Sequence, residues 1–174
     1  MKPINALALK ISLSTGLRIS DVLSIKWRNI IGNMISVTSS KTHKDGTFLV
    51  DADTLTAIYK LCPLTGSNGY IFPGKGKCGH RTRQAVFIDM RQAATALKVL
   101  EHATPHSARK TFAVGMRKRG LTETQIQEAL QHSARSTTKI YSRSDKLNLT
   151  PERLDELVDL ICDRVTERLK KCEQ

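Results

Sequence analysis

The sequence predicts an α+β fold that is mostly helical and contains a small antiparallel β-sheet or hairpin. Apolar residues recur at helical spacing along most of the chain, whereas a strand-turn-strand pattern is confined to residues 33–51. The chain has no Gly-rich phosphate loop, no long parallel-sheet pattern and no heptad run. Its 174 residues are enough for one domain with a sizeable core.

Two short helices are expected at the start of the chain. Apolar residues at helical spacing over residues 4–15 predict a helix that ends at Gly16. Ser20 and Asp21 can cap a second helix that continues through Trp27. The junction between these two helices is therefore expected near residue 18.

A β-hairpin and a helix are expected next. Residues 33–51 predict strand, turn and strand, with the dipeptide Asp45-Gly46 as the turn pair. A helix capped by Asp or Thr is expected over residues 51–62. Residues 63–80 are rich in Gly and Pro, which predicts a loop at the surface.

The second half of the chain is predicted to be helical. Helices are expected over residues 81–100, from Pro105 to a stop at Gly120, and from the Thr122 cap to about Leu130. A short helix from residue 136 and a last helix over residues 151–171 are expected after these.

The charge of the chain is strongly positive and unevenly distributed. Lysine and arginine number 28 against 16 acidic residues, for a net charge of +12. Residues 151–174 hold seven acids and five bases, so they carry −2 and residues 1–150 carry +14. This excess predicts a polyanionic partner for the body of the chain, although a ribosomal-type or membrane-surface protein would have a similar charge.

The composition argues against membrane and metal classes. No apolar run approaches the ~20 residues of a membrane span, so no membrane partner is expected. The four cysteines form no C-x-x-C pair, and the pair Cys78 and His80 has no second pair to complete a ligand set. We therefore expect no metal, no other cofactor, reduced thiols and a cytoplasmic location.

The four-residue word HSAR occurs at residues 106–109 and again at residues 132–135. The first copy begins a helix after Pro105, and the second follows the end of a helix near Leu130. A true repeat would share its hydrophobic framework, and these two segments do not. The two words must therefore be interpreted separately.

Two basic residues in the first half could carry chemistry, although each alone has an ordinary explanation as a surface residue. Arg18 lies at a helix junction, and its planar guanidinium can bind two phosphate oxygens at once. Lys41 lies on the hairpin, where its amine could reach a leaving oxygen. Lys44, three residues further on, is a competing candidate.

Four residues in the second half complete the candidate set. His106 and Arg109 are three apart at a helix start, so they share a face at an end that attracts anions. His132 follows a helix end, and Tyr141 lies nine residues further on. Together the six residues fit metal-free phosphoryl transfer from DNA, because they offer charge stabilisation, a covalent nucleophile and proton carriers.

The order of these residues resembles the tyrosine recombinases, the family of the phage integrases. The segment TGLRISDVLSIKW is similar to their first arginine box, and PHSARKTFA to their H-x-x-R box. LQHSARSTTKIY is similar to the segment with the second histidine and the nucleophile, and SKTHKDGTFLV to the lysine hairpin. The resemblance covers about residues 13–145 and implies a catalytic domain of the tyrosine-recombinase type.

The resemblance implies a catalytic role for each of six residues: Arg18, Lys41, His106, Arg109, His132 and Tyr141. The tyrosine would attack the scissile phosphate and give a 3′-phosphotyrosine and a free 5′-hydroxyl. The two arginines and the second histidine would hold the non-bridging oxygens. The lysine would protonate the leaving oxygen, and the first histidine would assist with the nucleophile's proton. The implied protein is a site-specific recombinase that acts on double-stranded DNA as a homo-oligomer, a tetramer.

The chain departs from the family's pattern in three places. Ala108 stands where the family commonly has leucine, and Gln131 where it commonly has glycine. Only 17 residues precede Arg18, so an N-terminal core-binding domain is expected to be absent.

Two alternative functions remain open: a type IB topoisomerase-like enzyme that relaxes DNA, and a catalytically inactive DNA-binding relative.

The expected organisation is a catalytic domain over residues 1–150 and a helical tail over residues 151–174. Apolar residues recur in the tail at steps of three and four, so one stripe of this helix is expected to be buried against protein. The partner surface is either the body of the same chain or a neighbouring protomer.

Overall fold

The computed structural model describes residues 1–64, 69–96 and 104–130. Its elements, in chain order, are α1 (Pro3–Thr15), α2 (Ile19–Leu23), the 3-10 helix η1 (Trp27–Asn29), β1 (Ile30–Ile31), β2 (Met34–Thr38), β3 (Asp45–Leu49), α3 (Ala52–Leu61), α4 (Arg83–Ala96), α5 (Pro105–Lys118) and α6 (Glu123–Ala129). The strands form one antiparallel sheet in the order β1-β2-β3. The prediction of a mostly helical α+β fold is confirmed. The helices expected from residues 136 and 151 lie outside the described residues.

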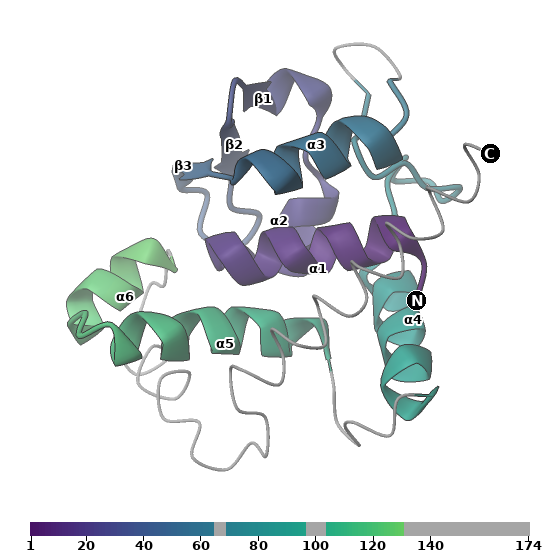
Figure 1. Ribbon diagram of the computed structural model, residues 1–174. Helices are drawn as coiled ribbons and strands as arrows, with labels where there is room; N and C mark the ends of the chain where they lie inside the picture. The colour runs from purple at the N-terminus through teal and green to yellow at the C-terminus, as the bar shows by residue number, and fades with distance from the viewer. Residues whose placement is uncertain (65–68, 97–103, 131–174) are drawn as a thin grey trace.

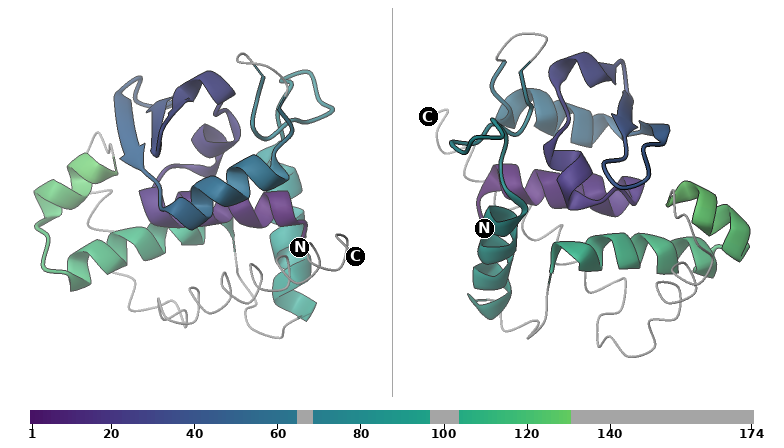
Figure 2. Two further views of the ribbon diagram at one scale, coloured as in Figure 1. Left: turned by 45° about the horizontal axis from the view of Figure 1, so that its top comes forward. Right: turned by 180° about the vertical axis from the view of Figure 1, so that it is seen from behind.

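Helix α1 is the centre of the arrangement and packs against α2, α3 and α5. Figures 1 and 2 show α3 and α5 on opposite sides of α1, with the sheet beside α3. Helix α4 stands near the N-terminus, and α6 folds back at the far end of α5. Among the helices that the structure describes, none is both long and apolar enough to span a bilayer.

Two apolar clusters stabilise this arrangement. The larger one draws fully buried side chains from α1, α2, β2, α3 and the loop before α4, including Ile11, Leu23, Ile35, Ile58 and Phe72. The smaller one lies between α5 and α6 and is built on three residues: Ala113, Ile126 and Leu130. The joint between the two clusters lies at the end of α1.

Most helix ends fall where the sequence predicts them. Gly16 closes α1 in the left-handed conformation, with φ of +70°. Asp51 caps α3 by accepting from the Thr54 amide, and Thr122 caps α6 with a reciprocal capping box. Pro105 occupies the first turn of α5, as expected.

The prediction for α2 was wrong at both ends. The helix covers only Ile19–Leu23, and Arg18 rather than Ser20 or Asp21 precedes it. The Asp21 carboxylate is buried and bonded to the distant residue Ser40, so it does not cap its own helix. A tertiary contact has therefore replaced the expected local one.

The predicted hairpin is present, but its turn is displaced. Asp45 and Gly46 lie inside β3, paired with residues of β2, and do not form the turn. The turn is built from residues 39–44, closed by bonds from the Ser39 amide to the Lys44 carbonyl and from the His43 amide to the Ser39 carbonyl. The additional strand β1 was not predicted, because two residues leave almost no periodic signal.

The loop at residues 63–80 was only partly predicted. Ile71 and Phe72 have no exposed surface, so the middle of this segment belongs to the core. The Ile71 amide bonds to the Ile25 carbonyl, and Lys26 pairs with Tyr70 as an isolated bridge. The surface expectation was wrong here because tertiary packing buries a run too short to predict an element.

Gly16 should tolerate no side chain. A Cβ there would lie 2.4 Å from Phe112 Cδ1 and 3.0 Å from Leu130 Cδ2, on a backbone that already disfavours other residues. We expect Gly16→Ala to lower the free energy of unfolding by about 2 kcal/mol, from strain and overpacking together. Urea denaturation measures this change.

Gly115 in α5 provides the matched control. A Cβ there would meet no atom within 4 Å. Gly115→Ala should therefore raise the free energy of unfolding by about 0.5–1 kcal/mol, from helix propensity and the unfolded chain. Equal effects of the two substitutions would contradict the tight joint at Gly16.

Candidate active site

Arg18 projects from a rigid turn between α1 and α2. The Ser12 hydroxyl donates to the Leu17 carbonyl at 2.7 Å, and the Leu17 amide donates to Thr15 Oγ1 at 3.3 Å. Leu17 and Ile19, on either side of the arginine, are buried in the core. These anchors fix the backbone, while the Arg18 side chain keeps 19% of its surface exposed.

The Arg18 guanidinium contacts one hydroxyl and one carboxylate. Its Nη1 donates to Ser39 Oγ at 3.2 Å and lies 3.9 Å from Asp21 Oδ2. Asp21 Oδ1 in turn accepts from the Ser40 amide at 3.2 Å and from the Ser40 hydroxyl at 2.5 Å. Asp21 thus connects the arginine to the hairpin turn, a role that the sequence analysis missed. Its position three residues after Arg18, on the same helical face, was the available signal.

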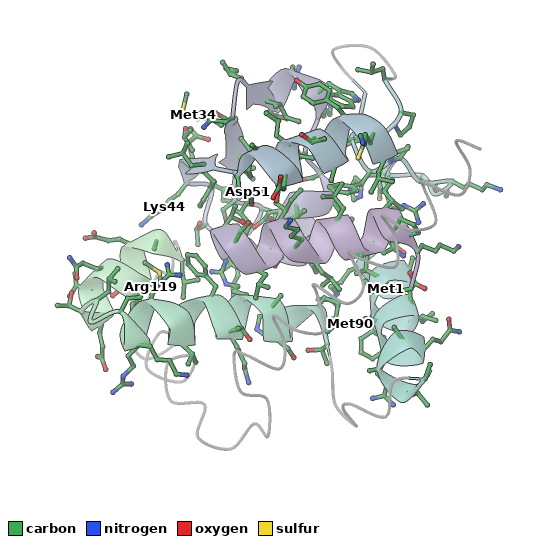
Figure 3. The ribbon with its side chains drawn as sticks, viewed as in Figure 1. Met1, Met34, Lys44, Asp51, Met90 and Arg119 are labelled. Carbon is green, nitrogen blue, oxygen red and sulfur yellow. The ribbon has the colours of Figure 1, made fainter. Side chains whose placement is uncertain are left out.

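Lys41 and Lys44 both lie on the 39–44 turn, and both are exposed. Figure 3 shows Lys44 extending from the hairpin on the side of the molecule where α6 lies. The bonds of Ser39 and Ser40 hold the base of this turn against Arg18 and Asp21. The structure therefore brings the predicted hairpin lysine to the Arg18 region, with Lys44 as a neighbour on the same turn.

Arg109 is a buried residue at the junction of three segments. It lies in α5, is 3% exposed, and donates through Nη1 to the Gly16 carbonyl and through Nη2 to the Leu130 carbonyl. Its Nε is buried and has no hydrogen-bond partner among the residues that the structure describes. Burial, and then the positive charge of Arg18, lower the pKa of Arg109 to about 10, while Asp21 opposes this shift. The guanidinium remains charged at neutral pH.

His106 is an exposed residue that lies one turn before Arg109 on α5. Partial loss of hydration lowers the pKa of His106, and four positive charges lower it further: Arg109, Lys110, Arg18 and Arg83. The neutral form, which can accept a proton, is therefore favoured at neutral pH. His106 shares one face of α5 with Arg109, which donates to the carbonyl of Gly16 two residues before Arg18.

The structure places Arg18 beside the end of α5 that carries His106 and Arg109, and it attaches the turn that carries Lys41 to Arg18 through Ser39. The other two predicted site residues, His132 and Tyr141, lie outside the described residues. Leu130, the last described residue, is held by Arg109 through its carbonyl and precedes His132 by two positions. Within residues 1–64, 69–96 and 104–130, no group of three or more His, Cys, Asp or Glu is arranged to hold a metal ion.

Comparison with known proteins places the chain in a family. The sequence profile of the Phage integrase family matches residues 2–148. The chain belongs to the phage integrase family. This assignment agrees with the resemblance to tyrosine recombinases, whose matched boxes lie within the same residues. No curated protein sequence gives a significant match to the chain.

Solved structures of recombinases share the fold. The XerH site-specific recombinase bound to its difH substrate matches with a TM-score of 0.64 at 20% identity, over 81% of this chain and 43% of that one. The XerA recombinase gives 0.64 at 21%, over 91% and 61%. A lambda integrase (75–356) dimer bound to a COC′ core site gives 0.64 at 19%, over 84% and 54%. The chain thus spans about half the length of these phage-integrase-like neighbours, and it has the fold of a tyrosine-recombinase catalytic domain.

The pKa of His106 should lie below the ordinary value of 6.5, and NMR titration of its ring protons measures it. Lys110→Gln removes one of the charges that lower this pKa, so the substitution should raise it. Lys118→Gln, at the other end of α5, should leave it unchanged. Added salt should raise it as well, by screening the cations.

The same shift makes a prediction about stability. The folded pKa is below the unfolded one, so on acidification the unfolded chain binds its proton first. The contribution of His106 is therefore neutral above pH 6.5 and becomes destabilising as the pH falls below that value. A His106 pKa at or above 6.5 in the folded protein would contradict the cationic environment.

Proposed function

We propose that this chain is the catalytic part of a site-specific recombinase that cleaves and rejoins double-stranded DNA through a 3′-phosphotyrosine. The observation that carries the proposal is the meeting of Arg18, Arg109 and His106 at one place, in a chain of the phage integrase family. Arg18 and the α5 pair lie far apart in the sequence, yet Arg109 donates to the carbonyl of Gly16, two residues before Arg18.

The charge balance of this site favours a phosphate. Burial, and then the positive charge of Arg18, lower the pKa of Arg109, and the Asp21 carboxylate opposes this shift. The Asp21 carboxylate is already engaged by Ser40. A phosphodiester bound between the arginines would relieve their repulsion and accept hydrogen bonds from guanidinium groups, which suit its oxygens.

The proposed reaction uses the six residues as follows. The Tyr141 oxygen attacks phosphorus, the bond from phosphorus to the 5′ oxygen breaks, and a 3′-phosphotyrosine forms. His106 takes the proton of the tyrosine, and Lys41 gives a proton to the leaving 5′ oxygen. Arg18, Arg109 and His132 stabilise the charge on the non-bridging oxygens. Attack by the 5′-hydroxyl of another strand reverses the step and conserves the phosphodiester, so no metal or nucleotide cofactor is required.

The partners follow from the same proposal. XerH and lambda integrase are described as bound to DNA sites, the latter as a dimer, and both resemble this chain in fold. The +14 charge of residues 1–150 supports DNA binding, since neutralising phosphates releases counterions. We propose a homo-oligomer on DNA, a tetramer, with residues 1–150 as the catalytic domain and residues 151–174 as a helical tail that packs on its own body or docks on a neighbouring protomer. The cytoplasmic location stays a prediction.

Tyr141→Phe tests the nucleophile. It removes the oxygen that would form the phosphotyrosine and keeps the ring, so DNA binding should persist while covalent trapping on a nicked suicide duplex disappears. The substrate is a nicked duplex whose flanking sequences are randomised. The measurement is the amount of covalent protein–DNA adduct on a denaturing gel. Tyr59→Phe, an exposed tyrosine on α3, is the matched control and should trap normally.

Three results separate the candidate functions. Trapping that survives Tyr141→Phe would identify another nucleophile. A wild-type chain that binds DNA and never forms an adduct would be an inactive relative. Relaxation of a single plasmid without strand exchange between two duplexes would favour the topoisomerase alternative.

Lys41→Ala tests the general acid. Loss of a positioned general acid should slow cleavage of ordinary DNA by about 100-fold or more. In a substrate with a 5′-bridging phosphorothiolate, the leaving group is a thiolate that departs without protonation. This substrate should therefore restore the cleavage rate of Lys41→Ala. Lys44→Ala is the matched control on the same turn, and rescue of Lys44→Ala instead would show that Lys44 is the acid.

A further inference from the structure

Ser39 is a nearly fully buried polar residue at the base of the 39–44 turn, and none of the sequence motifs includes it in the site. It is 1% exposed, although it lies between an exposed strand end and an exposed turn. A hydroxyl that is taken out of water needs hydrogen-bond partners to offset the loss. The partners of Ser39 come from two different parts of the candidate site.

The Ser39 hydroxyl accepts two hydrogen bonds. Arg18 Nη1 donates to Ser39 Oγ at 3.2 Å, and the Thr42 amide donates to the same oxygen at 3.4 Å. The first bond comes from the arginine of the α1–α2 turn, and the second closes the hairpin turn around Lys41. One oxygen atom therefore links Arg18 to the backbone on both sides of the lysine.

The neighbouring residue adds a second link. The amide and hydroxyl of Ser40 both bind Asp21 Oδ1, at 3.2 and 2.5 Å. Ser39 and Ser40 thus attach the turn to Arg18 and to Asp21, and these two side chains are themselves 3.9 Å apart. The exposed Lys41 side chain has four rotatable bonds, so the place where its amine can act depends on where this turn is held.

We propose that Ser39 is a positioning residue, whose hydroxyl holds the turn that carries Lys41 against the phosphate-binding Arg18. This inference rests on the proposed function, because it assigns a role within the same reaction. A displacement of about 1 Å at a reacting group lowers a rate by as much as 100-fold, so a fixed distance between the arginine and the lysine has catalytic value. Substitution of Ser39 should mimic part of the loss of Lys41.

Ser39→Ala removes the hydroxyl and leaves the backbone hydrogen bonds of residue 39 in place. The Ser39 amide still donates to the Lys44 carbonyl, and the Ser39 carbonyl still accepts from the His43 amide, so the strand pairing is retained. Ser36→Ala is the matched control. Ser36 lies in β2, three residues before Ser39, and its hydroxyl is 3.5 Å from Thr47 Oγ1 of β3.

The first measurement needs no DNA. Hydrogen exchange of the Thr42 amide should be faster in Ser39→Ala by about tenfold, because its acceptor is gone, and unchanged in Ser36→Ala. Arg18→Ala should also accelerate exchange of the Thr42 amide, because the Ser39 hydroxyl then loses the arginine that helps to hold it in place. An unchanged Thr42 exchange rate in Ser39→Ala would overturn the geometric basis of the proposal.

The second measurement is the rate of covalent adduct formation on nicked duplexes with randomised flanks. Ser39→Ala should slow it by about tenfold on an ordinary phosphodiester, and a 5′-bridging phosphorothiolate should restore it, as for Lys41→Ala. The double variant of Ser39 and Lys41 should be no slower than Lys41→Ala alone, since both act through one proton transfer. Ser36→Ala should behave as wild type.

The possible failures are distinguishable. A wild-type chain without any adduct on either substrate would refute the proposed function and this role with it. A wild-type chain that reacts, with Ser39→Ala equally fast, would refute the role alone. A Ser39→Ala defect that the phosphorothiolate does not restore would show that the hydroxyl acts through Arg18 and not through the lysine, which also overturns the proposal.

Discussion

The site depends on one buried cation. Arg109 extends from α5 and donates to the carbonyls of Gly16 and Leu130, the residues that follow α1 and α6. Removing a guanidinium from water is costly, and hydrogen bonds to carbonyls offset only part of that cost. The residual penalty appears in the lowered pKa of Arg109. Because both acceptors are backbone atoms at helix ends, this side chain fixes three helices relative to one another at the place where Arg18 emerges.

The surrounding packing makes this geometry possible. Gly16 lies against Phe112 and Leu130, so the end of α1 approaches the small α5–α6 cluster as closely as a residue without a side chain allows. The left-handed conformation of Gly16 also turns the chain from α1 toward α2. The same residue therefore ends a helix, joins the two apolar clusters and offers its carbonyl to Arg109. The cationic site lies at the joint between the clusters, and the rigidity of the joint is what holds its charges together.

The sequence predicted those features that depend on local chemistry. The helix ends at Gly16, Pro105 and Thr122 follow from backbone preferences that a few residues set, and they are confirmed. The meeting of Arg18 with the H-x-x-R helix was expected from the family resemblance.

The errors arose where a residue distant in the sequence determines the contact that a side chain makes. Asp21 was expected to cap its own helix and instead binds Ser40, and Asp45-Gly46 was expected to turn and instead pairs within the sheet. Ser39 has no sequence signal, because its role comes from burial and from Arg18, 21 residues earlier.

An excess of positive charge is the property that connects this structure to the proposed chemistry. Burial, and then four neighbouring cations, hold the pKa of His106 below its ordinary value, so the neutral ring can accept a proton. In the proposed reaction a phosphate enters this field with negative charge, which offsets the cations and raises the pKa of the imidazole beside it. The histidine would then become a stronger base when substrate is bound, at the step where the nucleophile loses its proton. The arginines would contribute in two ways: they bind the phosphate, and their neutralisation by it changes the protonation of the neighbouring histidine.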